Sequence, residues 1–239
     1  MKQAHFTLQR KGGVGKSLVS SIVAQYLQSL KVPLVAIDAD PGNSTLAGYK
    51  ALNAQRLEVM RNGSMDTGIF DSMIEQIIHE DSNFVIDNGA SSFVPLSSYV
   101  VENDVFKMIA KHGKQVYVHT VIKAGQELRS TLTGFNVLAE QMPEEARIIV
   151  WLNEYTGEVV ADGKTFEDMK IYKKHKDRVF GIVRIKERTS DTFGRDIRKM
   201  LEANLTFEEI NMHPDFHLMS KSRLFQVKKA IFDQLEIMV

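Results

Sequence analysis

The sequence predicts an α/β protein in which a mostly parallel, twisted sheet carries helices on both faces. Short runs rich in Val, Ile and Phe alternate along the chain with stretches of helical periodicity. These runs are apolar on both faces, which is typical of strands that helices cover from both sides. No internal repeat and no Gly-, Ser- or Pro-rich linker interrupts the 239 residues, so we expect a single domain over residues 1–239.

Six strands and three connecting helices follow from this pattern. Strands are expected at residues 4–8, 34–37, 84–86, 115–121, 148–152 and 179–185. Helices are expected at residues 17–30, 70–78 and 125–141, where apolar residues recur near a period of 3.6. Strand and helix therefore alternate, which predicts right-handed βαβ units.

The composition excludes several classes of protein. Lys+Arg and Asp+Glu both number 30, so no net charge draws the whole chain to nucleic acid or to an anionic membrane. The chain has no cysteine, which excludes thiolate metal sites, iron–sulfur clusters and cysteine nucleophiles. No apolar run approaches the roughly 18 residues of a membrane span, and the N-terminus has no signal-peptide pattern. We expect a cytoplasmic protein.

The segment between the first strand and the first helix carries a phosphate-binding pattern. It reads Arg10-Lys11-Gly12-Gly13-Val14-Gly15-Lys16-Ser17. Glycines let the backbone aim successive N–H groups at phosphate oxygens, and the start of the helix adds its positive end. We expect Lys16 to reach the β- and γ-phosphates of ATP and Ser17 to bind Mg²⁺. The fold class narrows to a single-domain P-loop NTPase whose nucleotide-binding residues include Gly12, Gly13, Val14, Gly15, Lys16 and Ser17.

One position departs from the general pattern of such a loop. The chain has Arg10 where the pattern has glycine. We expect Arg10 to add positive charge at the start of the loop, and it could also restrict the loop there. The rate of ATP turnover is left open by this difference.

Aspartates follow two of the expected strands. Asp38 and Asp40 come after the strand at 34–37, and Asp87 comes after the strand at 84–86. Parallel strands meet at one carboxyl edge, where ligands bind in α/β sheets. Asp87 fits a residue that holds Mg²⁺ through water, and Asp40 fits one that orients the attacking water. Asp38 could tune Mg²⁺ or its hydration shell, although each Asp alone is more commonly a turn former or helix cap.

Three segments of the chain resemble known motifs. Residues 11–17 are similar to the deviant Walker A motif of ParA/MinD-type ATPases, residues 38–43 to their switch I, and residues 84–87 to their Walker B motif. In this family the additional lysine, Lys11 here, crosses to the phosphates of the partner subunit. The resemblance implies an ATP-dependent homodimer, with Lys11, Lys16 and Asp40 in catalysis and Ser17, Asp87 and Asp38 at Mg²⁺.

A further resemblance covers most of the chain. Residues 48–53, 85–96, 150–153 and 194–196 are similar to TraL/StbB-type ATPases of conjugative plasmids. This implies a role in plasmid transfer or stable inheritance, in which a plasmid-encoded protein or a DNA complex is positioned. Members of the wider family often read adenine with an Asn at the place of Asn153, and pack a loop like residues 184–188 over the base. Asn153 could equally be a turn or helix-cap residue.

Two segments could contact a partner. Residues 170–199 carry eleven basic and four acidic residues, a run that could bind DNA phosphates without sequence specificity or could form a solvated face with internal salt bridges. Near the C-terminus, an apolar helix face is expected to dock on the core rather than on a membrane, because Asp233 and Glu236 disfavour anionic lipid. That face consists of Leu224, Val227, Ile231, Leu235 and Met238.

Three functions are consistent with these features. The leading one is an ATP-dependent dimerisation switch with slow, partner-stimulated hydrolysis. The second is a small-molecule kinase or ligase on the same scaffold, which needs a substrate pocket with convergent polar groups. The third is a nucleotide-stabilised scaffold with negligible ATP turnover, with which Arg10 in place of the usual glycine is compatible.

Overall fold

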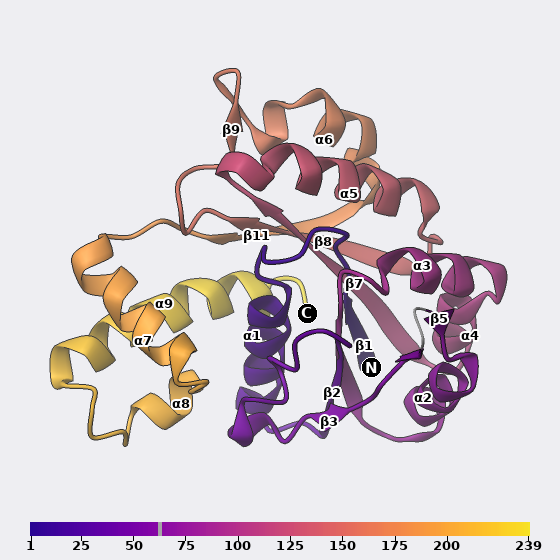
Figure 1. Ribbon diagram of the computed structural model, residues 1–239, viewed down its shortest axis with the longest axis horizontal. Helices are drawn as coiled ribbons and strands as arrows, with labels where there is room; N and C mark the ends of the chain where they lie inside the picture. Colours follow the sequence, from indigo (N-terminus) through magenta and orange to yellow (C-terminus); the bar gives the residue numbers. More distant parts are fainter. Residues whose placement is uncertain (62–63) are drawn as a thin grey trace.

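The computed structural model describes residues 1–61 and 64–239, and a seven-stranded sheet lies at its centre (Figure 1). The strand order is β11-β8-β7-β1-β6-β2-β3, and all described pairings within this sheet are parallel. The strands are β1 (Lys2–Thr7), β2 (Leu34–Ala39), β3 (Gln55–Arg56), β6 (Asn83–Asn88), β7 (Lys114–Lys123), β8 (Ala146–Asn153) and β11 (Val179–Ile185). The predicted parallel α/β architecture is confirmed, and all six expected strands are present.

Helices cover both faces of the sheet and bury a separate apolar cluster on each (Figure 1). One face packs against α2 (Thr67–His79), α3 (Phe93–Glu102), α4 (Val105–Lys111), α5 (Leu128–Gln141) and α6 (Lys170–His175). The other packs against α1 (Lys16–Ser29), α7 (Arg195–Glu202), α8 (Phe207–Ile210) and α9 (Leu218–Glu236). Strand residues serve the two clusters alternately: Val118 and Ile148 join the first, and Tyr117 and Ile149 the second.

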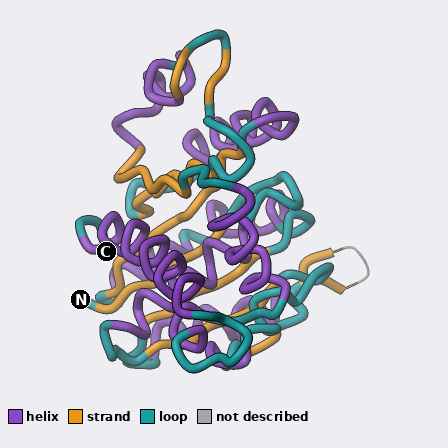
Figure 2. Tube along the Cα trace, turned by 90° about the vertical axis from the view of Figure 1, so that its left-hand side faces the viewer, coloured by secondary structure: helices purple, strands orange, loops and turns teal. Residues whose placement is uncertain are grey.

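Two short antiparallel hairpins lie outside the main sheet. They are β4 (Met60–Arg61) with β5 (Ser64–Met65), and β9 (Val160–Ala161) with β10 (Lys164–Thr165). The second hairpin projects from the body of the molecule beside α6, as Figure 2 shows. Neither hairpin is expected from the sequence, because two-residue strands are too short to show an alternating pattern.

The C-terminal helix docks on the core, as expected. Leu224, Val227, Ile231 and Leu235 are all buried on the face that α9 turns toward the sheet. Beyond α9, Met238 packs on β11 so closely that a Cβ on Gly181 would lie 2.4 Å from its Sδ. The two chain termini come near each other in both views (Figures 1 and 2). Among the described helices, none is long and apolar enough to cross a membrane.

Candidate functional site

The candidate site lies where β1 runs into α1. The connecting loop needs glycine at two positions, since Gly13 and Gly15 have φ angles of +71° and +107°, which other residues rarely adopt. Gly15 is also the N-cap of α1, and a Cβ there would lie 3.0 Å from Asn153 Nδ2. The loop borders a hollow of about 540 Å³ that Lys16, Ser17 and Asp40 also line.

Lys16 is buried within this site, with 6% of its surface exposed. Its ammonium donates a hydrogen bond to the Lys11 carbonyl at 3.3 Å. Burial lowers the pKa of Lys16, and the negative charges of Asp87 and Asp40 oppose that shift. Lys11 and Arg10 are exposed by contrast, so the loop carries one cation inside the site and two at its surface.

Asp87 lies at the carboxyl end of β6, between Thr7 on β1 and Asp38 on β2. Burial raises its pKa to about 6, with Asp38 adding to the rise and the Ser17 and Ser20 hydroxyls and Lys16 opposing it. Ser20 donates to Asp87 Oδ1 at 2.9 Å, whereas Oδ2 is buried without a hydrogen-bond partner in the described part of the chain. A buried, unpartnered carboxylate oxygen near a serine hydroxyl has the chemistry that Mg²⁺ requires, so Ser17 and Asp87 fit a divalent cation.

Asp38 is fully buried, and its two oxygens accept hydrogen bonds from the chain that follows. Oδ1 accepts from the Asp40 N–H at 3.2 Å, and Oδ2 from the Ala47 N–H at 2.8 Å. Burial raises the pKa of Asp38, and these backbone donors partly offset the rise. Asp38 thus anchors the loop over residues 40–47, which agrees with the turn-forming role that is the alternative interpretation of this residue. Its predicted effect on Mg²⁺ stays a prediction.

Asp40 caps the next turn of the same loop. Its Oδ1 accepts from the N–H groups of Gly42 at 2.8 Å and Asn43 at 3.3 Å. The loop after β6 packs directly on it, since a Cβ on Gly89 would lie 2.6 Å from Asp40 Oδ1 and 2.8 Å from Pro41 Cδ. Because nothing larger than glycine fits at position 89, the loops after β2 and β6 are interlocked beside the phosphate-binding loop.

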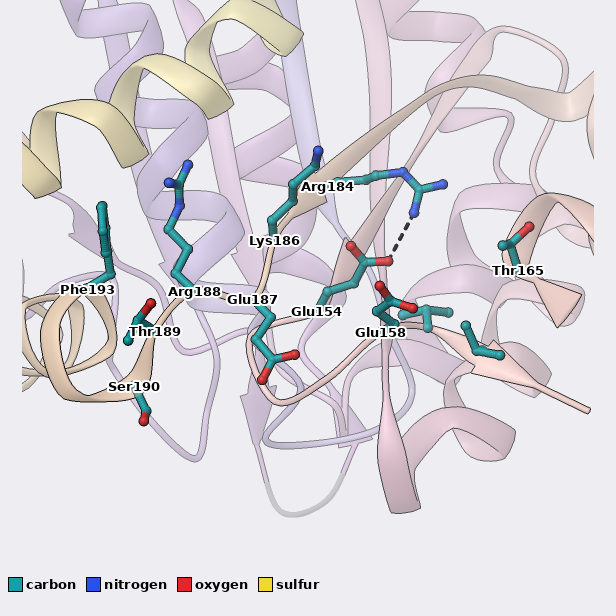
Figure 3. A pocket seen from close by; sticks show the side chains of 12 residues that line it. Glu154, Glu158, Thr165, Arg184, Lys186, Glu187, Arg188, Thr189, Ser190 and Phe193 are labelled. Carbon is teal, nitrogen blue, oxygen red and sulfur yellow. Dashed lines mark hydrogen bonds and ion pairs between the residues drawn. The ribbon is translucent and has the colours of Figure 1, made fainter. Parts of the chain in front are cut away.

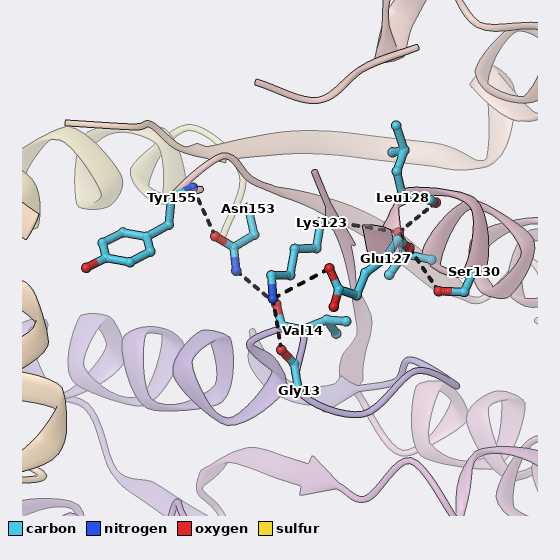
Figure 4. Close-up of polar contacts among 9 residues, drawn as sticks. Gly13, Val14, Lys123, Glu127, Leu128, Ser130, Asn153 and Tyr155 are labelled. Carbon is cyan, nitrogen blue, oxygen red and sulfur yellow. Dashed lines mark hydrogen bonds and ion pairs between the residues drawn. The ribbon is translucent and has the colours of Figure 1, made fainter. Parts of the chain in front are cut away.

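Two residues that the motifs did not indicate connect β7 to the phosphate-binding loop and to the residue that precedes it. Lys123 donates to the Gly13 carbonyl at 3.4 Å and lies 3.8 Å from the Glu127 carboxylate (Figure 4). Gln9 is buried, and its amide donates to the Val121 carbonyl at 2.9 Å. Neither could be found from a motif, because each is recognised only by the distant segment that it contacts.

Asn153 is held against the same loop. Its Nδ2 donates to the Val14 carbonyl at 2.9 Å, and its Oδ1 accepts from the Tyr155 N–H at 3.3 Å (Figure 4). Both ends of the amide are therefore occupied by backbone. The turn interpretation of Asn153 accounts for the second contact, and its predicted contact with adenine stays a prediction.

A second hollow, of about 940 Å³, lies beyond the ends of β8 and β11 and is larger than the one at the phosphate-binding loop. Most of the segment 184–188 lines it, and the predicted packing of this segment over adenine stays a prediction. Figure 3 shows Lys186 and Arg188 on one side and Glu154 and Glu158 on the other. Arg184 pairs with Glu154 at 3.0 Å and also with Glu167. Despite its size, this hollow has no glycine among its described lining residues, unlike the hollow at the phosphate-binding loop.

The basic run at 170–199 does not form one surface. Its residues are distributed over α6, the 3-10 turn at Lys176–Arg178, β11, the loop after it and α7, and α6 and α7 lie in different parts of the molecule (Figure 1). Several are engaged within the chain: Lys174 pairs with Glu140, Arg178 donates to the Met142 carbonyl at 2.8 Å, and Lys199 donates to the Asp215 carbonyl at 2.6 Å. The internal-pairing interpretation therefore accounts for much of the run.

Comparisons with known proteins agree with this geometry. The family described as the CobQ/CobB/MinD/ParA nucleotide binding domain matches residues 6–215. Two Escherichia coli proteins, each called Protein TraL, are 42% identical to this chain over 236 residues, 99% of this chain and 98% of each relative. Both resemblances expected from the motifs are confirmed.

Solved structures share the fold at low sequence identity. A MinC:MinD cell division protein complex from Aquifex aeolicus matches with a TM-score of 0.55 and 13% identity, covering 97% of this chain and 96% of the other. The MinD cell division protein from the same organism matches with a TM-score of 0.55 and 14% identity, covering 97% of both chains.

Proposed function

Because the chain belongs to the CobQ/CobB/MinD/ParA nucleotide-binding family, we propose that it is an ATPase that acts as an ATP-dependent dimerisation switch. The proposal rests on a buried Lys16 that the charge of Asp87 influences, and on an Asp87 carboxylate with one unpartnered oxygen in the described part of the chain, beside a glycine loop with an exposed lysine. In this arrangement the phosphate-binding groups are enclosed while Lys11 is free to reach another molecule.

Each residue of the site has a separate role in ATP hydrolysis. Lys16 exchanges its contact with the Lys11 carbonyl for the β- and γ-phosphates of ATP. Asp40, held by the interlocked loops, orients a water for in-line attack on the γ-phosphorus, so that the bond to ADP breaks and inorganic phosphate leaves. Ser17 and Asp87 would hold Mg²⁺, which when bound neutralises charge on the phosphates.

Dimerisation is what the resemblance to the family implies for Lys11, which in such proteins crosses to the phosphates of the partner subunit. The exposure of Lys11 is compatible with such a contact in a second copy placed face to face. We expect ATP to close the dimer and hydrolysis, slow until a partner stimulates it, to reopen it. The base would lie toward the second hollow, between Asn153 and the segment 184–188.

The cellular role follows from the relatives. The identity to two TraL proteins supports a role in plasmid conjugal transfer or stable plasmid inheritance, in which the ATP dimer recruits or positions a plasmid-encoded protein or a DNA complex. The unpaired members of the basic run leave room for direct, salt-sensitive contact with DNA phosphates.

The test is solution mass measured by light scattering, with Mg²⁺ and either ADP or ATP, on the wild type and on Asp40→Ala to suppress turnover. We expect the mass of one chain with ADP and of two with ATP, because only the γ-phosphate brings Lys11 across. Lys16→Ala is the control that should stay at the mass of one chain in both. If the wild type and Asp40→Ala each have the same solution mass with ADP and with ATP, the dimerisation switch is contradicted.

A small-molecule kinase or ligase is the second candidate, favoured by one observation. The hollow lined by Glu154, Glu158, Lys186 and Arg188 offers the convergent polar groups that such a substrate needs. A nucleotide-independent mass together with ATP turnover stimulated by a metabolite would support this function over the switch.

A further inference from the structure

The carbonyl groups of the phosphate-binding loop are held by donors from three places. Lys16 Nζ donates to the Lys11 carbonyl at 3.3 Å, Lys123 Nζ to Gly13 at 3.4 Å and Asn153 Nδ2 to Val14 at 2.9 Å. The first contact lies inside the site and must break when phosphate binds. The other two come from side chains outside the loop and do not occupy the hollow, so phosphate binding does not require them to break.

Lys123 and Asn153 are neighbours across the sheet. They are paired in register at the carboxyl ends of β7 and β8, and Figure 4 shows both side chains reaching the loop. Lys123 is fixed further by its own N–H, which donates to Thr131 Oγ1 at 3.3 Å, and by Glu127 beside its ammonium. With only 22% of its side chain exposed, Lys123 is held rather than freely solvated.

Peptide geometry links these contacts to phosphate binding. In a planar trans peptide the C=O and the following N–H point in opposite directions. Turning the Gly13 carbonyl to Lys123 therefore turns the Val14 N–H away from it, and turning the Val14 carbonyl to Asn153 does the same for the Gly15 N–H. Neither N–H donates to another group in the described part of the chain. Successive free N–H groups of this kind form an anion-binding concavity.

We propose that Lys123 is a positioning residue of the nucleotide site, which acts with Asn153 to keep the loop carbonyls turned away from phosphate. The inference rests on the proposed function and adds to it a residue outside the loop. Lys123 touches a carbonyl and Glu127, not the hollow itself, so it acts through the loop. Its contribution should therefore be the same for any nucleotide that fills the loop.

The experiment measures the affinities of ADP and ATP, with Mg²⁺, for the wild type, Lys123→Met and Lys123→Arg. We expect Lys123→Met to weaken both nucleotides by about tenfold, the effect of losing one hydrogen bond to a charged donor. Lys123→Arg keeps a charged donor and should stay within about threefold of the wild type. Lys107→Met, at an exposed lysine of α4, is the matched control and should change neither affinity.

The possible results distinguish failure of the positioning role of Lys123 from failure of the proposed function. Wild-type protein that binds neither nucleotide overturns the proposed function and the inference together. If the wild type binds but Lys123→Met matches it, only the positioning role is lost. Loss confined to ATP would make Lys123 a direct ligand of the γ-phosphate, and failure of Lys123→Arg to restore binding in a folded protein would also overturn the proposal.

A double variant gives an independent check. Lys123→Met and Asn153→Ala loosen the same loop, so their combined effect on ADP affinity should be smaller than the product of the two separate effects. Fully multiplicative effects would mean that the two side chains act separately, contrary to the proposal. Thermal unfolding of each variant verifies that the fold is retained.

Discussion

At the scale of single residues, the two lysines of the phosphate-binding loop differ in burial although they are close in sequence. Lys16 begins α1 and lies inside the site against the Lys11 carbonyl, whereas the Lys11 side chain is exposed. Lys16 is the first residue of α1 and is buried at the edge of the sheet, whereas Lys11 belongs to the preceding loop and lies at the surface. Their proposed roles should therefore be separable by mutation.

The first prediction compares Lys16→Ala with Lys11→Ala. Removing Lys16 should abolish measurable ATP binding, because among the described residues that line the hollow it is the one lysine that can meet the phosphates. Removing Lys11 should leave the affinity of a single chain within about threefold but slow hydrolysis by at least about tenfold. Isothermal titration and phosphate release measure the two effects. Unchanged affinity in Lys16→Ala would contradict the loop assignment, and normal hydrolysis in Lys11→Ala would contradict action across a dimer.

At the scale of elements, the loops after β2 and β6 control each other's position. Asp38 fixes the first loop through backbone hydrogen bonds, and Gly89 of the second lies where a side chain would collide with Asp40. The parallel pairing of β2 and β6 brings both loops to one edge. Because the two loops are in close contact, a movement of one loop, such as a response to nucleotide, must displace the other.

The second prediction concerns Gly89→Ala. The added Cβ should displace Asp40 and Pro41, lower the free energy of unfolding by about 1–3 kcal/mol and slow hydrolysis by about tenfold or more. ATP affinity should change less, since the atoms nearest the added Cβ belong to Asp40 and Pro41 and not to Lys16 or Ser17. Gly68→Ala is the matched control, because a Cβ in α2 meets only an ordinary contact at 3.6 Å. Wild-type hydrolysis by Gly89→Ala would show that the loops are not interlocked.

At the scale of the whole molecule, a chain of buried polar groups crosses three strands beneath the face that α1 and α9 cover. The Trp151 indole can only donate, so His119 Nδ1 accepts from it at 2.9 Å. His119 Nε2 then donates to His5 Nδ1 at 2.9 Å, and His5 Nε2 to Gln3 Oε1 at 3.0 Å. The Trp151 indole N–H thereby determines the neutral tautomer of His119 and, through it, that of His5.

Burial of these histidines makes stability depend on pH. Desolvation lowers the pKa of His119 to about 3, and desolvation together with His119 lowers that of His5. Below pH 6.5 the unfolded chain takes up protons that the folded chain does not, so stability falls as the pH falls. Asp87 acts in the opposite direction, since its raised pKa lets the folded protein bind a proton near pH 6.

The third prediction isolates His119 from those other groups. His119→Gln keeps an acceptor for Trp151 and a donor for His5 but does not titrate. Between pH 7 and pH 5 the wild type should lose about 2 kcal/mol more unfolding free energy than this variant. Denaturant unfolding at the two pH values measures the difference. Equal losses would mean that His119 is not held neutral in the folded protein.

The sequence alone predicted the parts of this protein that depend on local chemistry. The alternation of apolar strands with helices predicted the parallel sheet, and the segment 11–17 predicted the phosphate-binding loop, because glycine freedom and helix starts are properties of adjacent residues. The short helices α3, α4, α6, α7 and α8 were missed, since fewer than three turns give little periodic signal.

Only the tertiary structure decided which distant residues complete the site. The contacts of Lys123, Gln9 and Gly89 arise because parallel strands bring their ends to one edge. The basic run does not form one surface, because its residues are distributed from α6 through β11 and the loop after it to α7. A motif records which groups are neighbours along the chain. Contacts between residues more than a hundred positions apart, such as Lys123 with Gly13, arise from strand order and register, which local sequence does not encode.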